Sequence, residues 1–224
     1  SPLDYRYYGY DKELFEKLRP FVSEEAFIKY QAKVEAALVK VMAKRGICSE
    51  KVAEEVKEAC EKITAEEVYA EEQRIGHIVR ALVNCIKRRI SDEAKPYVHL
   101  SVTSADIVDT ATALRIKDLF KQVIIPDLLR LERQLIDFAR KTKDLVQIGR
   151  THGKYAVPIT FGFGLAKYVS RLGNRIWAIR EAVENLRGKI SGAVGAYNAS
   201  SLIFPDPEKF EEEVLGELGL KPST

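Results

Sequence analysis

Apolar residues recur every three or four positions through almost the whole chain, and polar residues fill the positions between them. This is the period of a helix that buries one face, and no run alternates convincingly with the period of two that a half-buried strand requires. We therefore predict an all-α protein. The expected helices are residues 23–45, 49–63, 64–90, 104–142, 160–187 and 206–218.

Residues that begin and end helices support these bounds. Ser23 is an N-cap residue followed by two glutamates, and the same helix ends before Gly46. Thr64 and Glu67 have the spacing of a capping box, in which each side chain bonds to the backbone of the other residue. The stripe of isoleucine, valine and leucine that follows predicts one helix up to about Ile90.

Two predicted helices, 104–142 and 160–187, are long enough for a helical bundle, and Pro126 is expected to kink the first of them. At 1.5 Å per residue they would be about 40–55 Å long, and their apolar stripes need cover from other subunits or from more chain. A turn-rich stretch at 91–96 marks a boundary near residue 98. We expect an N-terminal helical domain, 1–98, and the first part of a central long-helix bundle, 99–224.

Composition narrows the class of protein. With 224 residues and 46% hydrophobic residues the chain can bury a sizeable core, so it is not a disordered protein. Its formal net charge is only +3 although 31% of the residues are charged. Lys87-Arg88-Arg89 is too short a basic run for a nucleic-acid surface, so no nucleic acid is expected as a partner.

The cysteines and the apolar runs bear on where the protein works. Cys48, Cys60 and Cys85 are odd in number and lack the paired spacing of a zinc site or a disulfide framework, which suggests buried thiols in a reducing compartment. Neither an export signal nor a run of about eighteen apolar residues is found. We expect a cytoplasmic protein that does not interact with a membrane.

The segment Gly149-Arg150-Thr151-His152-Gly153-Lys154-Tyr155 places a histidine between glycines, beside a hydroxyl and a cation. An imidazole near its ordinary pKa can donate or accept a proton at neutral pH, and a neighbouring glycine lets the backbone approach a ligand. This pattern favours chemistry over packing, although by itself it is a weak signal.

Thr103 and Ser104 stand where a helix is expected to begin. Their hydroxyls and the first free backbone N–H groups can point together at a carboxylate or a phosphate. The alternative is a plain N-cap with Asp106 as an acid in the first turn. Asp106 would oppose an anion unless it holds another group.

Two further histidines have plainer readings. We place His77 within the helix 64–90, on its polar face near Gln73, Arg80 and Asn84, where a hydrogen-bonded surface histidine is the alternative to a functional one. His99 lies in the turn before Thr103 and could order that loop.

The N-terminal stretch Ser1-Pro2-Leu3-Asp4-Tyr5-Arg6-Tyr7-Tyr8 is rich in aromatic residues. A guanidinium at Arg6 beside a phenol at Tyr7 could clamp a phosphate, whereas the alternative is an aromatic strap packed on the helical domain. The glycines of 192–195 allow close backbone approach but do not form a nucleotide P-loop, and no metal-binding motif is found, so neither a metal nor a cofactor is expected.

Taken in this order, the clusters resemble the adenylosuccinate lyase family of the fumarase and aspartase superfamily, whose members are all-helical homotetramers. Four blocks carry the resemblance, and together they span most of the chain. They are the opening 1–7, Val102-Thr103-Ser104-Ala105-Asp106-Ile107-Val108-Asp109-Thr110-Ala111, Arg150-Thr151-His152-Gly153 with Pro158 and Phe161-Gly162, and Lys189-Ile190-Ser191-Gly192-Ala193-Val194-Gly195.

The resemblance implies cleavage of adenylosuccinate to AMP and fumarate, and of the succinyl-carboxamide purine intermediate, by C–N β-elimination. It implies that His152 is the general acid and that Thr103 and Ser104 donate to the succinyl carboxylate. Further implied roles are the phosphate for Arg6 and Tyr7, substrate orientation for His77, and substrate binding for Asp106 and Thr151.

This chain also departs from the family pattern. The family's flexible Ser-Ser-x-Met-Pro-x-Lys-x-Asn-Pro loop, which carries the base serine, is not found in the 224 residues. We therefore expect an N-terminal portion of the enzyme that is inactive alone. Ile78 stands where the family usually has aspartate, Ser101 replaces a glycine and Lys154 a common glutamine.

Two alternatives remain open. One is another superfamily enzyme, acting on argininosuccinate or forming a lactone as a carboxymuconate cycloisomerase does. The other is a non-catalytic helical module that only oligomerises, in which the clusters are caps and surface polar groups.

Overall fold

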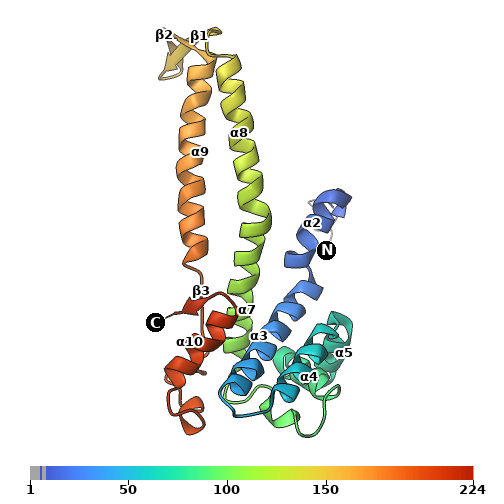
Figure 1. Ribbon diagram of the computed structural model, residues 1–224. Coiled ribbons are helices and arrows are strands. Elements are labelled where there is room, and N and C mark those ends of the chain that lie inside the picture. Colours follow the sequence, from blue (N-terminus) through green and yellow to red (C-terminus); the bar gives the residue numbers. More distant parts are fainter. Residues whose placement is uncertain (1–5, 7–8, 224) are drawn as a thin grey trace. The chain divides into compact units, whose positions relative to one another are not determined.

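The computed structural model describes residue 6 and residues 9–223, and helices make up most of it (Figure 1). It confirms the predicted all-α class, with only short strands added. The chain divides into two compact units, one made of the described residues up to Asp118 and from Leu186 onward, and one made of Leu119–Asn185. The predicted domain boundary near residue 98 stays a prediction.

The first unit is a helical domain. Its helices are α2 (Lys12–Val22), α3 (Glu24–Lys44), α4 (Glu50–Glu61), α5 (Ala65–Ile75), α6 (Ile78–Lys87), a 3-10 turn η2 (Lys95–Tyr97), α7 (Ser104–Leu119), a 3-10 turn η4 (Ser200–Leu202) and α10 (Pro207–Glu217). Two short strands, β3 (Arg187–Gly188) and β4 (Lys221–Pro222), pair in parallel.

Helix α3 forms the centre of this unit, with α4 and α5 beside it (Figure 1). Its inward side chains, such as Val34, Leu38 and Met42, are completely buried. Each buried aliphatic side chain of this size contributes about 1.5–3 kcal/mol relative to leaving it in water. The buried core therefore stabilises the helices, and the polar loops connect the ends of these helices.

The predicted helix starts are confirmed where a capping side chain was recognised. The Ser23 and Ser49 hydroxyls accept the N–H groups of Ala26 and Val52. Thr64 and Glu67 form the complete capping box at the start of α5. These bonds satisfy backbone donors that have no partner within the helix.

The single helix predicted over 64–90 is wrong, because the chain turns at Gly76. Gly76 has φ +74° and ends α5, and His77, with extended backbone, is the N-cap of α6. Glycine adopts this left-handed conformation without the clash that a Cβ would cause. Both short helices bury an apolar face, so the hydrophobic period runs through the break and conceals it.

The segment after residue 185 folds back onto the same unit. Phe204 and Phe210 stack with ring centroids 3.9 Å apart, and both are buried. The buried carboxylate of Glu211 in α10 accepts the Ile190 N–H and the Tyr197 hydroxyl, at 2.5 Å each. Segment 190–197 is thereby fixed at both ends.

The second unit is a pair of antiparallel helices, α8 (Ile125–Lys141) and α9 (Phe161–Glu184), that lie side by side (Figure 1). A π-helical turn, η3 (Phe120–Ile124), precedes α8, so the predicted helix 104–142 is divided into α7, this turn and α8. Pro126, which has no N–H to donate, occupies the first turn of α8. The predicted helix 160–187 is confirmed, with Thr160 as its N-cap.

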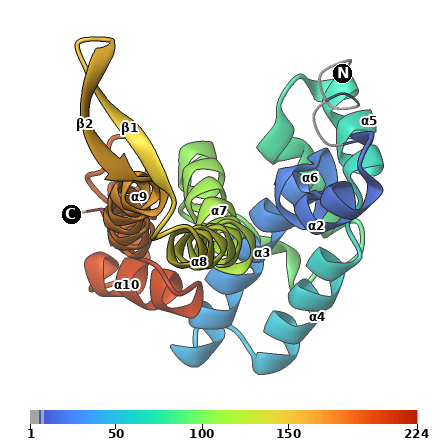
Figure 2. The same cartoon turned by 90° about the horizontal axis from the view of Figure 1, so that it is seen from above.

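A β-hairpin joins α8 to α9, contrary to the expectation that no strand would be found. Strands β1 (Val146–Thr151) and β2 (Lys154–Thr160) pair antiparallel, and the hairpin extends beyond the helices (Figures 1 and 2). Most of its side chains are exposed on both faces. Strands of this kind carry no buried stripe, so the hydrophobic period cannot detect them.

Candidate anion-binding site

Two helix N-termini meet where His77 faces Ser104. His77 Nε2 lies 3.2 Å from Ser104 Oγ; His77 is the N-cap of α6, and Ser104 is the first residue of α7. The first N–H groups of a helix have no partner within it and add to the positive end of its dipole. Two such ends at one place favour an anion over a cation.

The capping bond of His77 favours one tautomer of the neutral imidazole. Nδ1 accepts the N–H of Arg80 at 3.2 Å, so this nitrogen carries no proton in the cap. In the neutral ring the proton then lies on Nε2, which donates to Ser104 Oγ. The serine hydroxyl can turn its own proton towards a bound anion. His77 is therefore not the helix-face residue that we predicted, but a cap that orients a hydroxyl.

Asp106 completes the start of α7. It is fully buried, and its carboxylate accepts the Thr103 N–H at 2.9 Å and the Gly192 N–H at 3.2 Å. The Lys189 ammonium group is its charged partner. We expected Asp106 to oppose an anion unless it binds another group. Lys189 is that group. A direct contact between Asp106 and substrate stays a prediction.

Lys189 is a residue that the sequence reasoning did not single out, although it stands in one of the recognised blocks. It lies 83 positions from Asp106 in the chain, so no local pattern joins them. The signal that could have found it is electrostatic: a buried carboxylate beside a predicted anion site needs a cation nearby.

The turn before Thr103 is held by a buried carboxylate of α3. Glu35 of α3 is completely buried, and its carboxylate accepts the backbone N–H of His99 at 3.1 Å and lies 2.6 Å from His99 Nδ1. His99 and Ser101 have φ of 63° and 66°, a left-handed conformation that costs about 1–2 kcal/mol without glycine. This agrees with the expectation that His99 orders the loop.

His152 and Thr151 belong to the second unit. His152 and Gly153 form the two-residue loop of the β-hairpin, with φ of 51° and 74°, as in a type I′ turn. The loop exposes the imidazole at the tip of the hairpin, and Thr151 is exposed beside it. The Arg150 guanidinium lies over the Tyr155 ring at 4.9 Å. Convergence of His152 with Thr103 and Ser104 stays a prediction.

The predicted phosphate clamp falls at the edge of the described chain. Arg6 is exposed, and Tyr7 lies outside the described residues. Their pairing around a phosphate stays a prediction.

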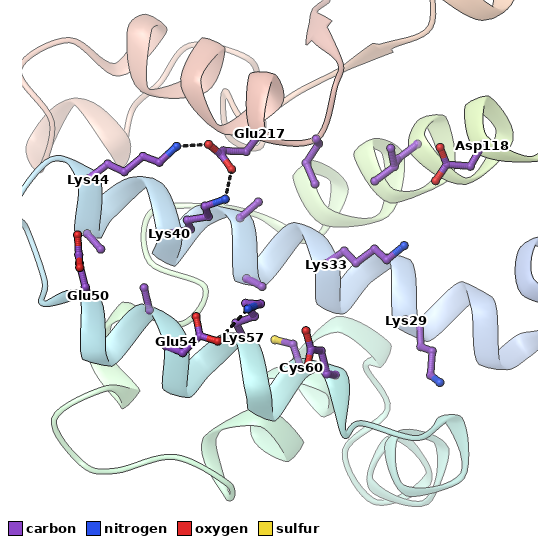
Figure 3. Close-up of a pocket in the computed structure, with 17 residues that line it drawn as sticks. Lys29, Lys33, Lys40, Lys44, Glu50, Glu54, Lys57, Cys60, Asp118 and Glu217 are labelled. Carbon is purple, nitrogen blue, oxygen red and sulfur yellow. Dashed lines mark hydrogen bonds and ion pairs between the residues drawn. The ribbon is translucent and has the colours of Figure 1, made fainter. Parts of the chain in front are cut away.

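A separate groove of about 870 Å³ crosses the first unit along α3 (Figure 3). Alanines 36, 37, 43 and 53 are among its lining residues, and five lysines stand along it. Their charges are balanced locally, since Lys40 and Lys44 both contact Glu217, and Lys57 pairs with Glu54 at 2.8 Å. The lysines of the groove are therefore largely occupied by carboxylate partners, and no such partner pairs with the helix N-termini at His77 and Ser104 in the contacts described above.

Metal ligands and membrane-spanning helices were the remaining features of interest for function. Among residue 6 and residues 9–223, no group of three or more histidine, cysteine, aspartate or glutamate side chains could hold a metal ion. The three cysteines are free thiols, and burial raises the pKa of each. Among the described helices, none combines the length and apolarity that crossing a membrane requires.

The chain is thus a helical protein with a candidate anion site at two helix N-termini. The sequence profile of the family described as Lyase matches residues 8–223, so the chain belongs to this family of lyases. Within it, the chain is 36% identical over 223 residues to the adenylosuccinate lyase of Archaeoglobus fulgidus, covering 99% of this chain and 47% of that one.

Other relatives carry different names. The N-acetyl-S-(2-succino)cysteine lyase of Enterococcus italicus is 30% identical over 93% of this chain and 45% of its own length. The fold matches the crystal structure of a fumarate lyase from Mesorhizobium sp. BNC1, with a TM-score of 0.83, 28% identity, and coverage of 93% of this chain and 49% of that one. The chain thus spans about half the length of the relatives it matches.

Proposed function

We propose that these 224 residues form part of an adenylosuccinate lyase, which cleaves adenylosuccinate to AMP and fumarate and also acts on the succinyl-carboxamide purine intermediate. A cytoplasmic homotetramer would catalyse the reaction without a metal or a cofactor. The similarity to adenylosuccinate lyases over nearly the whole chain supports this substrate.

The observation that carries the proposal is the contact between His77 and Ser104 at two helix N-termini. The succinyl group of the substrate bears two carboxylates, and a third negative charge develops when the adjacent carbon loses its proton. Each helix end contributes about 0.3–1 kcal/mol to binding a nearby anion, and up to about 2 kcal/mol where the site is partly buried. The Thr103 and Ser104 hydroxyls would add directed hydrogen bonds to a carboxylate.

The reaction would proceed by β-elimination. A base removes the proton next to a carboxylate, the carbanion is held by hydrogen-bond donors, and an acid protonates the departing nitrogen. We assign the acid to His152, whose exposed position at the hairpin tip suits delivery of a proton to a ligand held elsewhere. Thr151 would contact the substrate beside it, and the base is assigned to none of the 224 residues.

A second candidate reaction is favoured by the N-acetyl-S-(2-succino)cysteine lyases among the relatives. Such a substrate carries the same succinyl group on sulfur, so His77, Thr103 and Ser104 would serve both reactions alike. The difference lies in the rest of the substrate, because only the nucleotide carries a phosphate for Arg6 and Tyr7. A guanidinium bonded to phosphate contributes about 1.5–3 kcal/mol.

Ligand titration followed by NMR tests the site in this chain. Fumarate should shift the Ser104 amide and the His77 ring signals, and AMP should shift signals at Arg6. A chain whose His77 and Ser104 signals ignore fumarate would contradict the proposal, and so would signals that respond equally to chloride. Acetate, with one carboxylate, is the matched control and should bind more weakly.

A turnover test separates the two substrates. The 224 residues would be joined to the C-terminal half of the Archaeoglobus fulgidus enzyme, starting where the similarity ends. We expect fumarate release from adenylosuccinate to exceed release from N-acetyl-S-(2-succino)cysteine, and Arg6→Ala to lower only the former. The opposite preference would establish the second candidate.

A further inference from the structure

The carboxylate of Asp106 is bonded entirely within the chain. Oδ2 accepts the N–H of Thr103, the residue just before α7, and both oxygens lie 3.2 Å from the N–H of Gly192. Oδ1 also receives the Lys189 ammonium group, which in turn donates to the carbonyl oxygen of Gly192 at 2.5 Å. One ion pair, between the buried Asp106 and the partly exposed Lys189, thus joins the first turn of α7 to the segment that begins at Lys189.

A second pair of bonds fixes Lys189 from the same face of α7. The Thr110 hydroxyl, four residues after Asp106, donates to the Lys189 carbonyl oxygen and accepts the Lys189 N–H, each at 2.9 Å. Positions four apart lie on one face of a helix, so Asp106 and Thr110 hold Lys189 together. Thr110 thus fixes the Lys189 backbone, while Asp106 and the Gly192 carbonyl oxygen bind its ammonium group.

The charge of this pair matters for an anion site. Asp106 lies within three positions of both Thr103 and Ser104, and an unneutralised carboxylate there would repel a dicarboxylate. Lys189 cancels that charge. The segment after it, Ala193–Val194–Gly195, is exposed and starts beside the first turn of α7, where it can form a wall of the same site.

We propose that Asp106 and Lys189 are positioning residues of the anion site: their ion pair holds Thr103 and Ser104 in register with the segment 191–197 and neutralises the site for a dicarboxylate. This inference rests on the proposed function. It gives Asp106 an indirect role, through Thr103 and Gly192, in place of a direct contact with substrate. It also adds Lys189 to the residues on which the site depends.

The test uses the 224-residue chain with Lys189→Met, Lys189→Arg, Asp106→Asn and the double variant Lys189→Met/Asp106→Asn. The control is Lys117→Met, which removes another α7-region lysine that donates to a backbone carbonyl, that of Gly219 at 2.8 Å. Three quantities are measured: thermal unfolding, amide hydrogen exchange at Thr103 and Gly192, and the Kd for fumarate.

Lys189→Met should speed exchange at Thr103 and Gly192 about tenfold while amides in the body of α7, such as Leu114, stay unchanged. It should weaken fumarate binding by about tenfold, because a like charge is then uncompensated a short distance from the ligand. The double variant should bind fumarate more tightly than Lys189→Met does. A lysine with only a structural role would not produce that recovery. Lys189→Arg should bind like the unchanged chain.

Each result decides one question. Fumarate binding and exchange rates that persist in Lys189→Met overturn the inference, and so does a double variant that binds no better than the single one. If Lys189→Met does not fold, failure of the folded Lys189→Arg chain to bind overturns it. An unchanged chain that binds no fumarate overturns the proposed function instead, and the exchange rates then still decide whether the pair holds the two segments.

Discussion

At the scale of single residues, His77 performs two tasks that substitution can separate. Its Nδ1 caps α6 and its Nε2 reaches Ser104. Asparagine caps helices as well as any residue, so His77→Asn should keep the free energy of unfolding within about 0.5 kcal/mol, whereas His77→Ala should lower it by about 1 kcal/mol. Both variants should lose the fumarate-induced shift at Ser104.

Urea unfolding measures the first effect and NMR titration the second. If His77→Asn kept the full fumarate response, the imidazole would have no part in the anion site. Equal stabilities of the alanine variant and the unchanged chain would show instead that the capping bond is not formed.

Sequence reasoning reached some of these residues and not others, and the reason is distance along the chain. The placing of Thr103, Ser104 and Asp106 at a helix start follows from adjacent residues, and the structure begins α7 at Ser104. His77 was recognised as polar but assigned to the middle of a helix, because Gly76 alone signalled the break. Lys189 meets Asp106 only after the chain has folded back, which no local pattern encodes.

At the scale of elements, Glu71 clamps α5 to α6 on either side of the Gly76 turn. Its side chain is almost completely buried and accepts Arg74 Nη2 and Asn84 Nδ2 at 2.7 Å each, with Arg88 as a further donor. Hydrogen bonds from Arg74, then Arg88 and Asn84, lower the pKa of Glu71 to about 2. Glu71 thereby joins α5 to α6 across the turn that carries His77.

The lowered pKa predicts how acid acts on this clamp. Because the folded pKa lies below the unfolded value of about 4.3, the stabilisation is complete above about pH 5 and is lost as the pH falls towards 2. The difference in unfolding free energy between the unchanged chain and Glu71→Gln should therefore shrink over that range. Urea titrations from pH 2 to 7 measure it, and a difference that does not change with pH would contradict the account.

As a control at pH 7, Glu54→Gln removes a carboxylate whose pair with Lys57 is exposed to solvent. Exposed pairs contribute about 0–1 kcal/mol. The loss of stability should accordingly be smaller than for Glu71→Gln.

Gly162 and Gly164 lie near the start of α9, and we expect alanine at these two positions to change stability in opposite directions. A Cβ on Gly162 would lie 2.3 Å from the Ala139 carbonyl oxygen and 2.8 Å from the Lys143 backbone, so Gly162→Ala must push the helices apart. We expect a loss of about 2–3 kcal/mol from overpacking. At Gly164 the nearest atom is the flexible end of Gln147, at 3.1 Å, so Gly164→Ala should gain up to about 1 kcal/mol of helix propensity.

Hydrogen exchange of α8 and α9 amides measures both glycine variants within this unit. Equal effects of the two alanines would show that the helices do not meet at Gly162.

The helix α9 and the hairpin before it show which elements the sequence can predict and which it cannot. Local capping rules predict a helix that starts at Thr160. They do not predict the hairpin before it, because neither face of the hairpin packs on a core.

At the scale of the whole molecule, the second unit lacks a core of its own. Its buried large apolar side chains are Val123, Ile176 and Val183. Many others are exposed to at least a third of their area: Leu129, Leu131, Phe138, Leu145, Val146, Ile148, Tyr155, Val157, Phe163, Tyr168 and Trp177. We expect exposed apolar side chains in this number to be covered by other subunits or by more chain. The sequence predicted this need for cover from the two apolar stripes alone.

Trp177 is the only tryptophan of the chain and is 69% exposed on α9, so its fluorescence reports directly on that cover. If copies of the chain associate through α8 and α9, as we propose for a tetramer, raising the concentration should shift its emission to shorter wavelength and protect it from acrylamide. Light scattering should show the mass rising over the same range.

Leu131→Asp places a charge on the exposed face of α8 and should abolish both changes, since burying an unpaired charge costs several kcal/mol. Leu202→Asp, at an 87% exposed position of the first unit, should leave both intact. Were the mass to rise while Trp177 stayed quenchable, association would use another surface, and the bundle face would have to be covered by a different partner.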